Sequence, residues 1–193
     1  GRPSRAGQTV LVRGDRIVAI GGRRDVAVPR GVEVIDMTGR FVIPGLIDMH
    51  VHSEDMERIY PPLYLANGVT TVREMAGYPF LYAWRDRVAA GDLFGPRWVV
   101  GSPPVDGSPS LWEGFPLPHF AVKDAAEARR VVGQVKQDGA DFVKVYTRLP
   151  RDVFHALADE ARRQRIPIAG HCPDFVPVAE ASDAGMRSIE HVF

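Results

Sequence analysis

Residues 41–52 read FVIPGLIDMHVH, and the rest of the chain is best interpreted outward from this stretch. Pro44 and Gly45 interrupt a run of apolar residues, and a second apolar run follows them and ends in an H-x-H pair. Because side chains alternate between the two faces of a strand, His50 and His52 point to the same side. Surface or packed histidines also produce such pairs, so the meaning of this one depends on its context.

On the carboxyl side of this stretch, a strand pattern and a helix pattern alternate along the whole chain, which implies parallel strands joined by crossover helices. The predicted strands are residues 46–52, 70–75, 97–101, 142–146, 168–171 and 188–192. A helical stretch reaching residue 67 and helices at residues 79–90, 124–138, 152–164 and 176–184 connect them, with Asp124 as an expected N-cap.

Six β/α units fit the first part of an eight-stranded barrel, which usually needs about 250 residues. We therefore predict the α/β class and a TIM-type β/α barrel, with six of eight strands present, over residues 45–193. A flavodoxin-like open sheet is the alternative. The barrel is favoured because no glycine-rich phosphate loop follows the first strand and because polar residues recur at several strand ends.

On the amino side, residues 1–44 contain short β-branched runs at 9–12, 16–20, 32–36 and 41–43, separated by glycine-containing pairs. This punctuation predicts a small antiparallel β-sandwich-like domain, with a hairpin that turns at Gly14 and Asp15. A flexible leader is the alternative interpretation.

The composition excludes several classes of protein. The 193 residues include 24 Lys+Arg and 24 Asp+Glu, so there is no electrostatic reason to expect nucleic acid as a partner. The apolar runs are far shorter than the ~20 residues that cross a bilayer, so we expect no membrane partner. Cys172 is the single cysteine, which excludes a disulfide scaffold and favours the cytoplasm. Without an initiator Met or a leader, the sequence is expected to start inside a longer protein.

Four of the six histidines end predicted strands. His171 ends the segment IAGH and His191 ends the segment SIEH, in addition to His50 and His52. Active sites of β/α barrels lie at the carboxyl ends of the strands. Imidazole nitrogens together with an oxygen ligand suit zinc or another divalent transition metal, whereas calcium and magnesium prefer oxygen ligands.

Lys144 lies in the middle of FVKVY, residues 142–146, where a buried parallel strand would ordinarily be apolar. Alternation sends Val143 and Val145 outward to the helices and sends Lys144 and Tyr146 inward. A lysine that extends to solvent from a strand end is the alternative.

The stretch FVIPGLIDMHVH resembles the first-strand signature of the metal-dependent amidohydrolase superfamily. The resemblance covers nearly the whole chain, and its details are most similar to the imidazolonepropionase-related branch, which includes uncharacterised hydrolases and some dipeptidases acting on Xaa-Pro bonds. It extends to residues 10–12, 16–21, 67–73, 170–171 and 189–191.

The resemblance implies two divalent metal ions, expected to be zinc. His50 and His52 would bind the more buried ion, His171 and His191 the more exposed one, and a carboxylated Lys144 would bridge them. The family also places a proton-shuttling Asp at the end of an eighth strand, which this chain lacks. We therefore assign no catalytic residue within the chain and expect the chain alone to be inactive.

The implied activity is hydrolysis of a C–N bond in a cyclic amide, lactam or amide by a metal-activated hydroxide. Two alternatives stay open, namely an Xaa-Pro-type metallo-dipeptidase and a non-catalytic metal-binding fragment. The expected partner is a small-molecule or dipeptide substrate, and the protein is expected to form homo-oligomers.

Other residues have less specific interpretations. Tyr146 would hydrogen-bond a substrate carboxylate or carbonyl, or else fill a barrel layer. Asp48 would bond a ligand imidazole or else form a salt bridge. Glu190 would face away from His191 without a role, and Cys172 would be small and buried. The loop at residues 102–122 would overhang the site and influence substrate choice, or else be a solvated surface loop. This loop carries Asp106, Trp112, Glu113, Phe115 and His119, of which His119, like His155 elsewhere, is expected at the surface.

Overall fold

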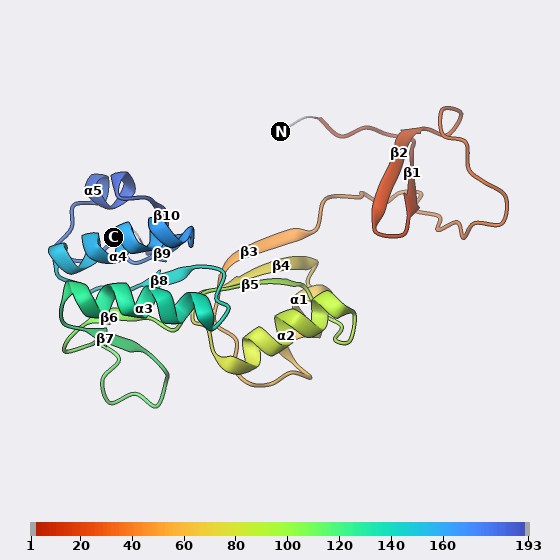
Figure 1. Cartoon of the computed structure of the whole chain (residues 1–193). Helices are drawn as coiled ribbons and strands as arrows, with labels where there is room; N and C mark the ends of the chain where they lie inside the picture. Colours follow the sequence, from red (N-terminus) through yellow and green to blue (C-terminus); the bar gives the residue numbers. More distant parts are fainter. Residues whose placement is uncertain (1–2, 192–193) are drawn as a thin grey trace. The chain divides into compact units, whose positions relative to one another are not determined.

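The computed structural model describes residues 3–191 and divides the chain into two compact units, residues 1–43 and residues 44–193 (Figure 1). The first unit contains β1 (Gln8–Arg13) and β2 (Arg16–Gly22), which pair antiparallel. Arg13 pairs with Arg16, so the predicted hairpin turn at Gly14 and Asp15 is confirmed.

The other β-branched runs of the first unit form no strand. Within the described residues, 32–36 and 41–43 pair with no neighbour, and Val34 and Ile35 are exposed. A strand needs a partner that satisfies its backbone hydrogen bonds, and composition alone does not supply one. The structure therefore contains a hairpin where the sequence predicts a β-sandwich-like domain.

The second unit is an α/β fold in which every strand pair is parallel. One sheet has the order β3-β4-β5 and the other has the order β10-β9-β8-β6-β7. The strands are β3 (Leu46–Val51), β4 (Val69–Glu74), β5 (Arg97–Val100), β6 (Val105–Gly107), β7 (Phe120–Val122), β8 (Val143–Val145), β9 (Ile168–Gly170) and β10 (Met186–Ile189). The helices are α1 (Tyr60–Ala66), α2 (Pro79–Ala90), α3 (Ala125–Gln137), α4 (Arg151–Gln164) and α5 (Val178–Asp183).

The backbone joins the two sheets where the end of β5 meets the start of β8. Gly101 forms a parallel bridge with Phe142, and the Ser102 N–H donates to the Phe142 carbonyl at 2.9 Å. Strands β3, β4, β5, β8, β9 and β10 therefore follow one another in the order that a barrel requires. Among the described residues β3 and β10 do not pair, so closure into a barrel stays a prediction.

The segment predicted as a plain loop, residues 102–122, contains two short strands. β6 pairs with β8 through Val105 and Val145, and β7 pairs with β6 over its whole length. Pro103 and Pro104 separate β6 from β5, because proline has no N–H to donate to a neighbouring strand. The sequence predicts a loop over the whole of residues 102–122, and the structure differs at these two short strands.

The predicted elements differ from the observed ones mainly at their ends. The predicted N-cap of α3 is confirmed, since the Asp124 carboxylate accepts the Glu127 N–H at 2.9 Å. β10 ends at Ile189, before the predicted end at residue 192, which lies outside the described residues. No helix within residues 3–191 is long and apolar enough to cross a membrane.

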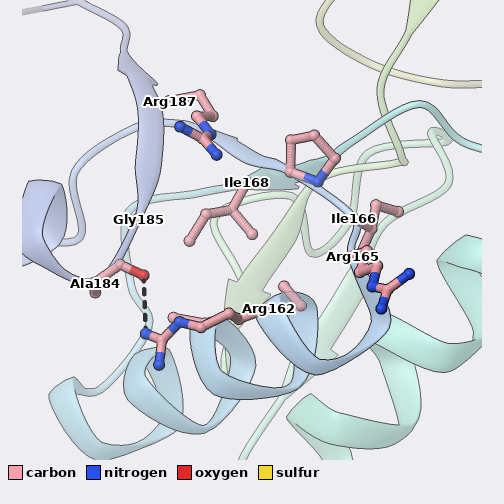
Figure 2. A pocket seen from close by; sticks show the side chains of 10 residues that line it. Arg162, Arg165, Ile166, Ile168, Ala184, Gly185 and Arg187 are labelled. Atoms are coloured by element: carbon pink, nitrogen blue, oxygen red, sulfur yellow. Dashed lines mark hydrogen bonds between the residues drawn. The ribbon is translucent and has the colours of Figure 1, made fainter.

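A hollow of about 460 Å³ lies where β9 and β10 begin (Figure 2). Apolar residues of α4 and β9 line it together with Arg162, Arg165 and Arg187. The amino ends of barrel strands generally serve stability, whereas the carboxyl ends hold active sites. We therefore do not interpret this hollow as the active site.

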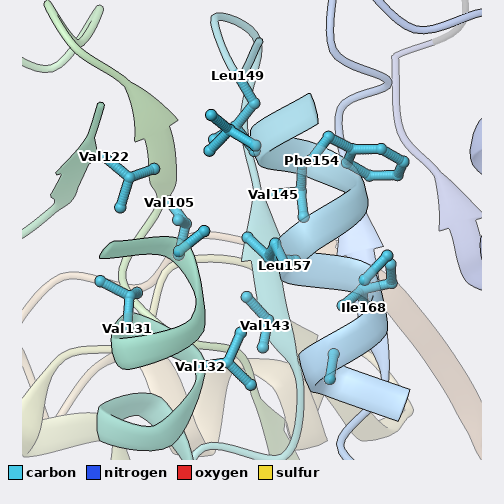
Figure 3. Close-up of a cluster of buried hydrophobic side chains, with 14 of the residues drawn as sticks. Val105, Val122, Val131, Val132, Val143, Val145, Leu149, Phe154, Leu157 and Ile168 are labelled. Carbon is cyan, nitrogen blue, oxygen red and sulfur yellow. The ribbon is translucent and has the colours of Figure 1, made fainter. Parts of the chain in front are cut away.

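The largest apolar core lies between the five-stranded sheet and helices α3 and α4 (Figure 3). Val143 and Val145 of β8 belong to this core, whereas Phe142 packs with Met75 and Ala169 in a separate cluster. The predicted outward direction of the two valines is thereby confirmed. Leu157 of α4 is fully buried in the same core.

Replacing Leu157 by Ala should lower the free energy of unfolding by about 2–5 kcal/mol, because it removes buried methyl groups and leaves a cavity. Leu63 provides a matched control, since it is also a helical leucine but is 52% exposed, so Leu63→Ala should change stability far less. Urea unfolding monitored by circular dichroism measures both values. Equal losses for the two variants would contradict the assignment of the core.

Candidate metal centre

The four predicted ligand histidines lie at the carboxyl ends of three parallel strands. His50 lies in β3 and His52 directly after it, His171 follows β9, and His191 lies two residues beyond β10. The ring centroids of His50 and His52 are 5.1 Å apart, those of His50 and His191 are 4.5 Å apart, and those of His171 and His191 are 5.0 Å apart. The structure thus brings all four imidazoles together.

A carboxylate faces Nδ1 of each histidine in the H-x-H pair. Glu190 Oε2 lies 2.9 Å from His50 Nδ1, and Glu74 Oε1 lies 3.7 Å from His52 Nδ1. The two Nε2 atoms lie 3.2 Å apart, where one ring can donate an N–H···N hydrogen bond to the other, depending on their tautomers. If both protons reside on Nδ1, two nitrogen lone pairs meet at this distance, and they repel each other unless a cation lies nearby.

His171 has a similar arrangement. The Thr147 hydroxyl lies 3.0 Å from His171 Nδ1, so Nε2 is left to bind another group. Burial lowers the pKa of His171 to about 4, with further lowering from the charges of Lys144 and His191. Burial likewise lowers the pKa of His52 to about 4. Both rings are therefore neutral near pH 7, which is the form that binds metals.

Lys144 is buried in the middle of β8, with 2% of its surface exposed. Burial lowers its pKa to about 8, the Glu190 carboxylate opposes this shift, and the Arg73 guanidinium adds to it. With a pKa near 8, roughly one tenth of the amines are neutral at pH 7, far more than for an ordinary lysine.

The donor set has the chemistry of a transition-metal site, because it combines neutral imidazoles with a partly neutral amine. Within residues 3–191, however, no three His, Cys, Asp or Glu side chains are arranged to hold one ion. The structure gathers the predicted ligands without completing their coordination geometry, so the ligand assignment stays a prediction.

Glu190 was expected to face away from His191 without a role, but the structure places its carboxylate 2.9 Å from Nδ1 of His50. Alternation continues to Glu190, because Ser188 and Glu190 lie on the same side and hydrogen-bond each other, and the Glu190 N–H still donates to the Gly170 carbonyl of β9. The strand pattern is instead interrupted at His191, which has a φ of +54°. The Glu190 carboxylate contacts His50 and accepts hydrogen bonds from Arg73 and Ser188. Burial raises the pKa of Glu190, but these hydrogen bonds and the charge of Arg73 outweigh burial and lower it to about 2.

Glu74 is a second acidic residue that the sequence did not single out. It ends β4, is fully buried, and accepts the Ser53 N–H at 2.8 Å. Burial raises its pKa to about 7, although the hydrogen bonds from Ser53 oppose this shift. Asp48, which was expected to bond a ligand ring, accepts the backbone N–H of His50 at 3.1 Å instead.

An aromatic series leads from the β6–β7 connection to the histidines. The ring centroids of Trp112 and Tyr146 are 5.4 Å apart, and those of Tyr146 and His171 are 4.1 Å apart. Phe115 contacts Trp112. The connection thus approaches the histidines through its aromatic residues.

Buried Asp106 anchors this connection rather than taking part in the site. It accepts hydrogen bonds from the N–H groups of Leu111 and Arg148 and from the Ser110 hydroxyl. His119 bonds the Leu117 carbonyl, and Cys172 donates to the Val176 carbonyl and is partly buried.

Comparison with known proteins gives relatives of one general kind. No protein-family model matches the chain. A dihydroorotase of Pelobacter propionicus is 26% identical over 187 residues, which cover 88% of this chain and 41% of that protein. A protein from Bifidobacterium longum that is provisionally named a prolidase has a TM-score of 0.81 and 26% identity, covering 94% of this chain and 48% of that one. Bottromycin amidohydrolase has a TM-score of 0.69 and 33% identity, and the match covers 78% of this chain and 32% of that one.

These likenesses support the amidohydrolase superfamily and the parallel α/β fold. None of them points specifically to the imidazolonepropionase-related branch. The chain spans less than half the length of each of these three proteins.

Gly170, which precedes His171, should not tolerate a side chain. It has a φ of +137°, and a Cβ there would lie 2.2 Å from the Val145 carbonyl oxygen and 3.1 Å from Lys144 Cδ. Gly170→Ala should therefore displace His171 and Lys144 and lower the free energy of unfolding by more than the ~1–3 kcal/mol of backbone strain alone.

Gly185→Ala is a control that separates backbone strain from steric overlap of the new Cβ atom. Gly185 also has a positive φ, of +103°, but a Cβ added there would meet no atom within 4 Å. Denaturant unfolding of both variants measures the difference. A Gly170 variant as stable as the Gly185 variant would show that the close contact with β8 is not rigid.

Proposed function

We propose that the chain is part of a metal-dependent amidohydrolase that cleaves a C–N bond in a small-molecule cyclic amide, lactam or amide. The observation that carries this proposal is the gathering of four imidazoles beside buried Lys144, with Nε2 of His50 facing Nε2 of His52. The names of the related proteins, a dihydroorotase and an amidohydrolase, support C–N hydrolysis at a general level.

Five side chains would hold two divalent ions, for which zinc is the expected metal. His50 and His52 would bind one ion and His171 and His191 the other, while Lys144 would bridge them after carboxylation. When bound, the two ions supply a water that is acidic enough to ionise near neutral pH and a positive charge that polarises the scissile carbonyl.

The residues of the chain contribute ligand orientation and substrate binding. A neutral Lys144 amine can form an N–C bond to carbon dioxide and release one proton to solvent, which gives an anionic carbamate oxygen ligand, and its pKa near 8 makes the neutral amine accessible. Burial raises the pKa of Tyr146, with a further contribution from Asp106, so its hydroxyl keeps its proton. Tyr146 can therefore donate a hydrogen bond to a substrate carbonyl or carboxylate beside His171.

Transfer of a proton to the leaving nitrogen needs a further group. The family resemblance assigns that step to an Asp at the end of an eighth barrel strand, and the described residues 3–191 contain no such strand. We therefore assign no catalytic acid or base within the chain, and a metal-binding fragment without activity remains an alternative for the chain in isolation.

A metallo-dipeptidase acting on Xaa-Pro bonds is the second candidate function. It is favoured by the TM-score of 0.81 to the Bifidobacterium protein provisionally named a prolidase. A lactam hydrolase and a dipeptidase differ in their need to bind a free substrate carboxylate, so comparing Xaa-Pro dipeptides with their C-terminal amides distinguishes them. A dipeptidase should hydrolyse the dipeptides and reject the amides, whereas a cyclic-amide hydrolase should cleave neither.

Replacing Lys144 by Ala in the protein at the length its gene encodes should remove bound metal and activity, because the bridging ligand is lost. A small carboxylic acid at high concentration should restore part of both by entering the vacated space. Elemental analysis measures metal content directly. Lys123→Ala is the control, since Lys123 is exposed and forms an ion pair with Glu127 at the surface. A Lys144→Ala protein that keeps two metals per chain and the parent rate would rule out the bridge.

Residues 1–193 by themselves should hydrolyse neither cyclic amides nor dipeptides, because the proton-transfer group assigned by the resemblance is absent. The test is to assay this polypeptide beside the protein encoded by the whole gene, with zinc supplied to both. Comparable rates would show that a group within residues 1–193 performs the proton transfer.

A further inference from the structure

The Glu190 carboxylate lies between three partners from three strands or their ends. One oxygen lies 2.9 Å from Nδ1 of His50, while the other accepts from Nη2 of Arg73 at 2.5 Å and from the Ser188 hydroxyl at 2.6 Å. Only 11% of the Glu190 side chain and 12% of the Arg73 side chain are exposed. A carboxylate held in this way has little freedom to turn away from His50.

Arg73 uses each of its three guanidinium nitrogens. From β4, its Nε donates to the Met49 carbonyl of β3 at 2.7 Å, and its Nη1 donates to the Ser188 hydroxyl of β10 at 2.7 Å. The third nitrogen bonds Glu190. A planar guanidinium has the rigid set of donors that such a junction requires, and a lysine ammonium does not.

The backbone does not provide this connection. β3 and β4 belong to the three-stranded sheet, whereas β10 is at the edge of the five-stranded sheet. The side chains of Arg73, Glu190 and His50 therefore connect the first and second strands of the predicted barrel with the sixth across its interior.

We propose that Glu190 and Arg73 are positioning residues of the metal centre: Glu190 keeps the His50 proton on Nδ1 and turns Nε2 toward the metal, and Arg73 fixes Glu190. The His50 ring is then held in this orientation only while the end of β10, which carries Glu190, stays beside β3 and β4. The part of this proposal that concerns metal affinity rests on the proposed function, whereas the part that concerns the His50 ring does not.

The physical reason is that a neutral imidazole carries one proton, which either nitrogen can hold. A carboxylate beside Nδ1 stabilises the proton there, and the free lone pair of Nε2 becomes the metal ligand. An ion pair that only stabilised the fold would affect stability without selecting one tautomer of His50. The tautomer is therefore the observable that separates the two roles.

The first measurement is long-range ¹H–¹⁵N spectroscopy of the histidine rings in the metal-free protein at the length its gene encodes, with the His50 signal assigned from a His50→Asn variant. In the parent protein His50 should carry its proton on Nδ1. In Glu190→Ala the signal should shift toward the average of the two tautomers. A parent protein with the His50 proton on Nε2 would overturn the proposal.

The second measurement is zinc affinity by competition with a chelator. Glu190→Ala should lower it by about 10- to 100-fold, the range typical when a group that orients a ligand is removed. Arg73→Lys should lower it less, because charge is retained but the three-way junction is lost. Parent-level affinity and a parent-like His50 tautomer in a folded Glu190→Ala protein would overturn the proposal.

Glu180→Ala is a matched control, because Glu180 also contacts a histidine and an arginine, His155 and Arg151, but between the surfaces of α4 and α5. It should leave both the His50 signal and zinc affinity unchanged. If Glu190→Ala does not fold, Glu190→Gln carries the test: a weakened zinc affinity supports the proposal and parent-level affinity overturns it. A parent protein that binds no zinc would refute the proposed function, while the His50 tautomer would still decide the positioning role.

Discussion

The ion pair between Arg73 and Glu190 is the contact on which the candidate centre depends. The two sheets of the second unit are joined by backbone pairing at Gly101 and Phe142, on one side of the strand order. Across the interior, the Arg73 guanidinium of β4 donates to Glu190 at the end of β10 and to the Met49 carbonyl in β3. His50 lies in one sheet and His191 follows the edge strand of the other, and their rings are neighbours where this junction brings the strand ends together.

Burial has a consistent effect on the basic groups that gather there. It lowers the pKa of His52 and His171 to about 4 and that of Lys144 to about 8. Burial thus disfavours the protonated form of each of these three side chains. They lie close together, so their positive charges would also repel one another. Neutral nitrogen ligands around a metal ion avoid this cost, and at neutral pH the ion does not have to displace protons from these two imidazoles.

The sequence predicts the parts of this arrangement that follow from local periodicity. Alternation correctly separates Val143 and Val145 from the interior, and the hairpin turn at Gly14 and Asp15 is where the glycine indicates. The prediction that Glu190 has no role assumed that His191 was still part of the strand. Ser188 and Glu190 share a side as alternation requires, whereas His191 has a positive φ and departs from the pattern. Strands β6 and β7 were missed because each has only three residues and depends on pairing with a distant partner, which no local pattern reveals.

The proline pair between β5 and β6 has a consequence for how such a protein can diversify. Where Pro103 and Pro104 offer no N–H to β8, the Ser102 hydroxyl accepts the Lys144 N–H at 2.9 Å and donates to the Pro103 carbonyl at 2.7 Å. The backbone at Lys144 is therefore held before the chain enters the aromatic connection between β6 and β7. That connection can lengthen, shorten or change its side chains over evolutionary time without altering the support of the Lys144 backbone, so the loop can diversify while the buried amine stays in place.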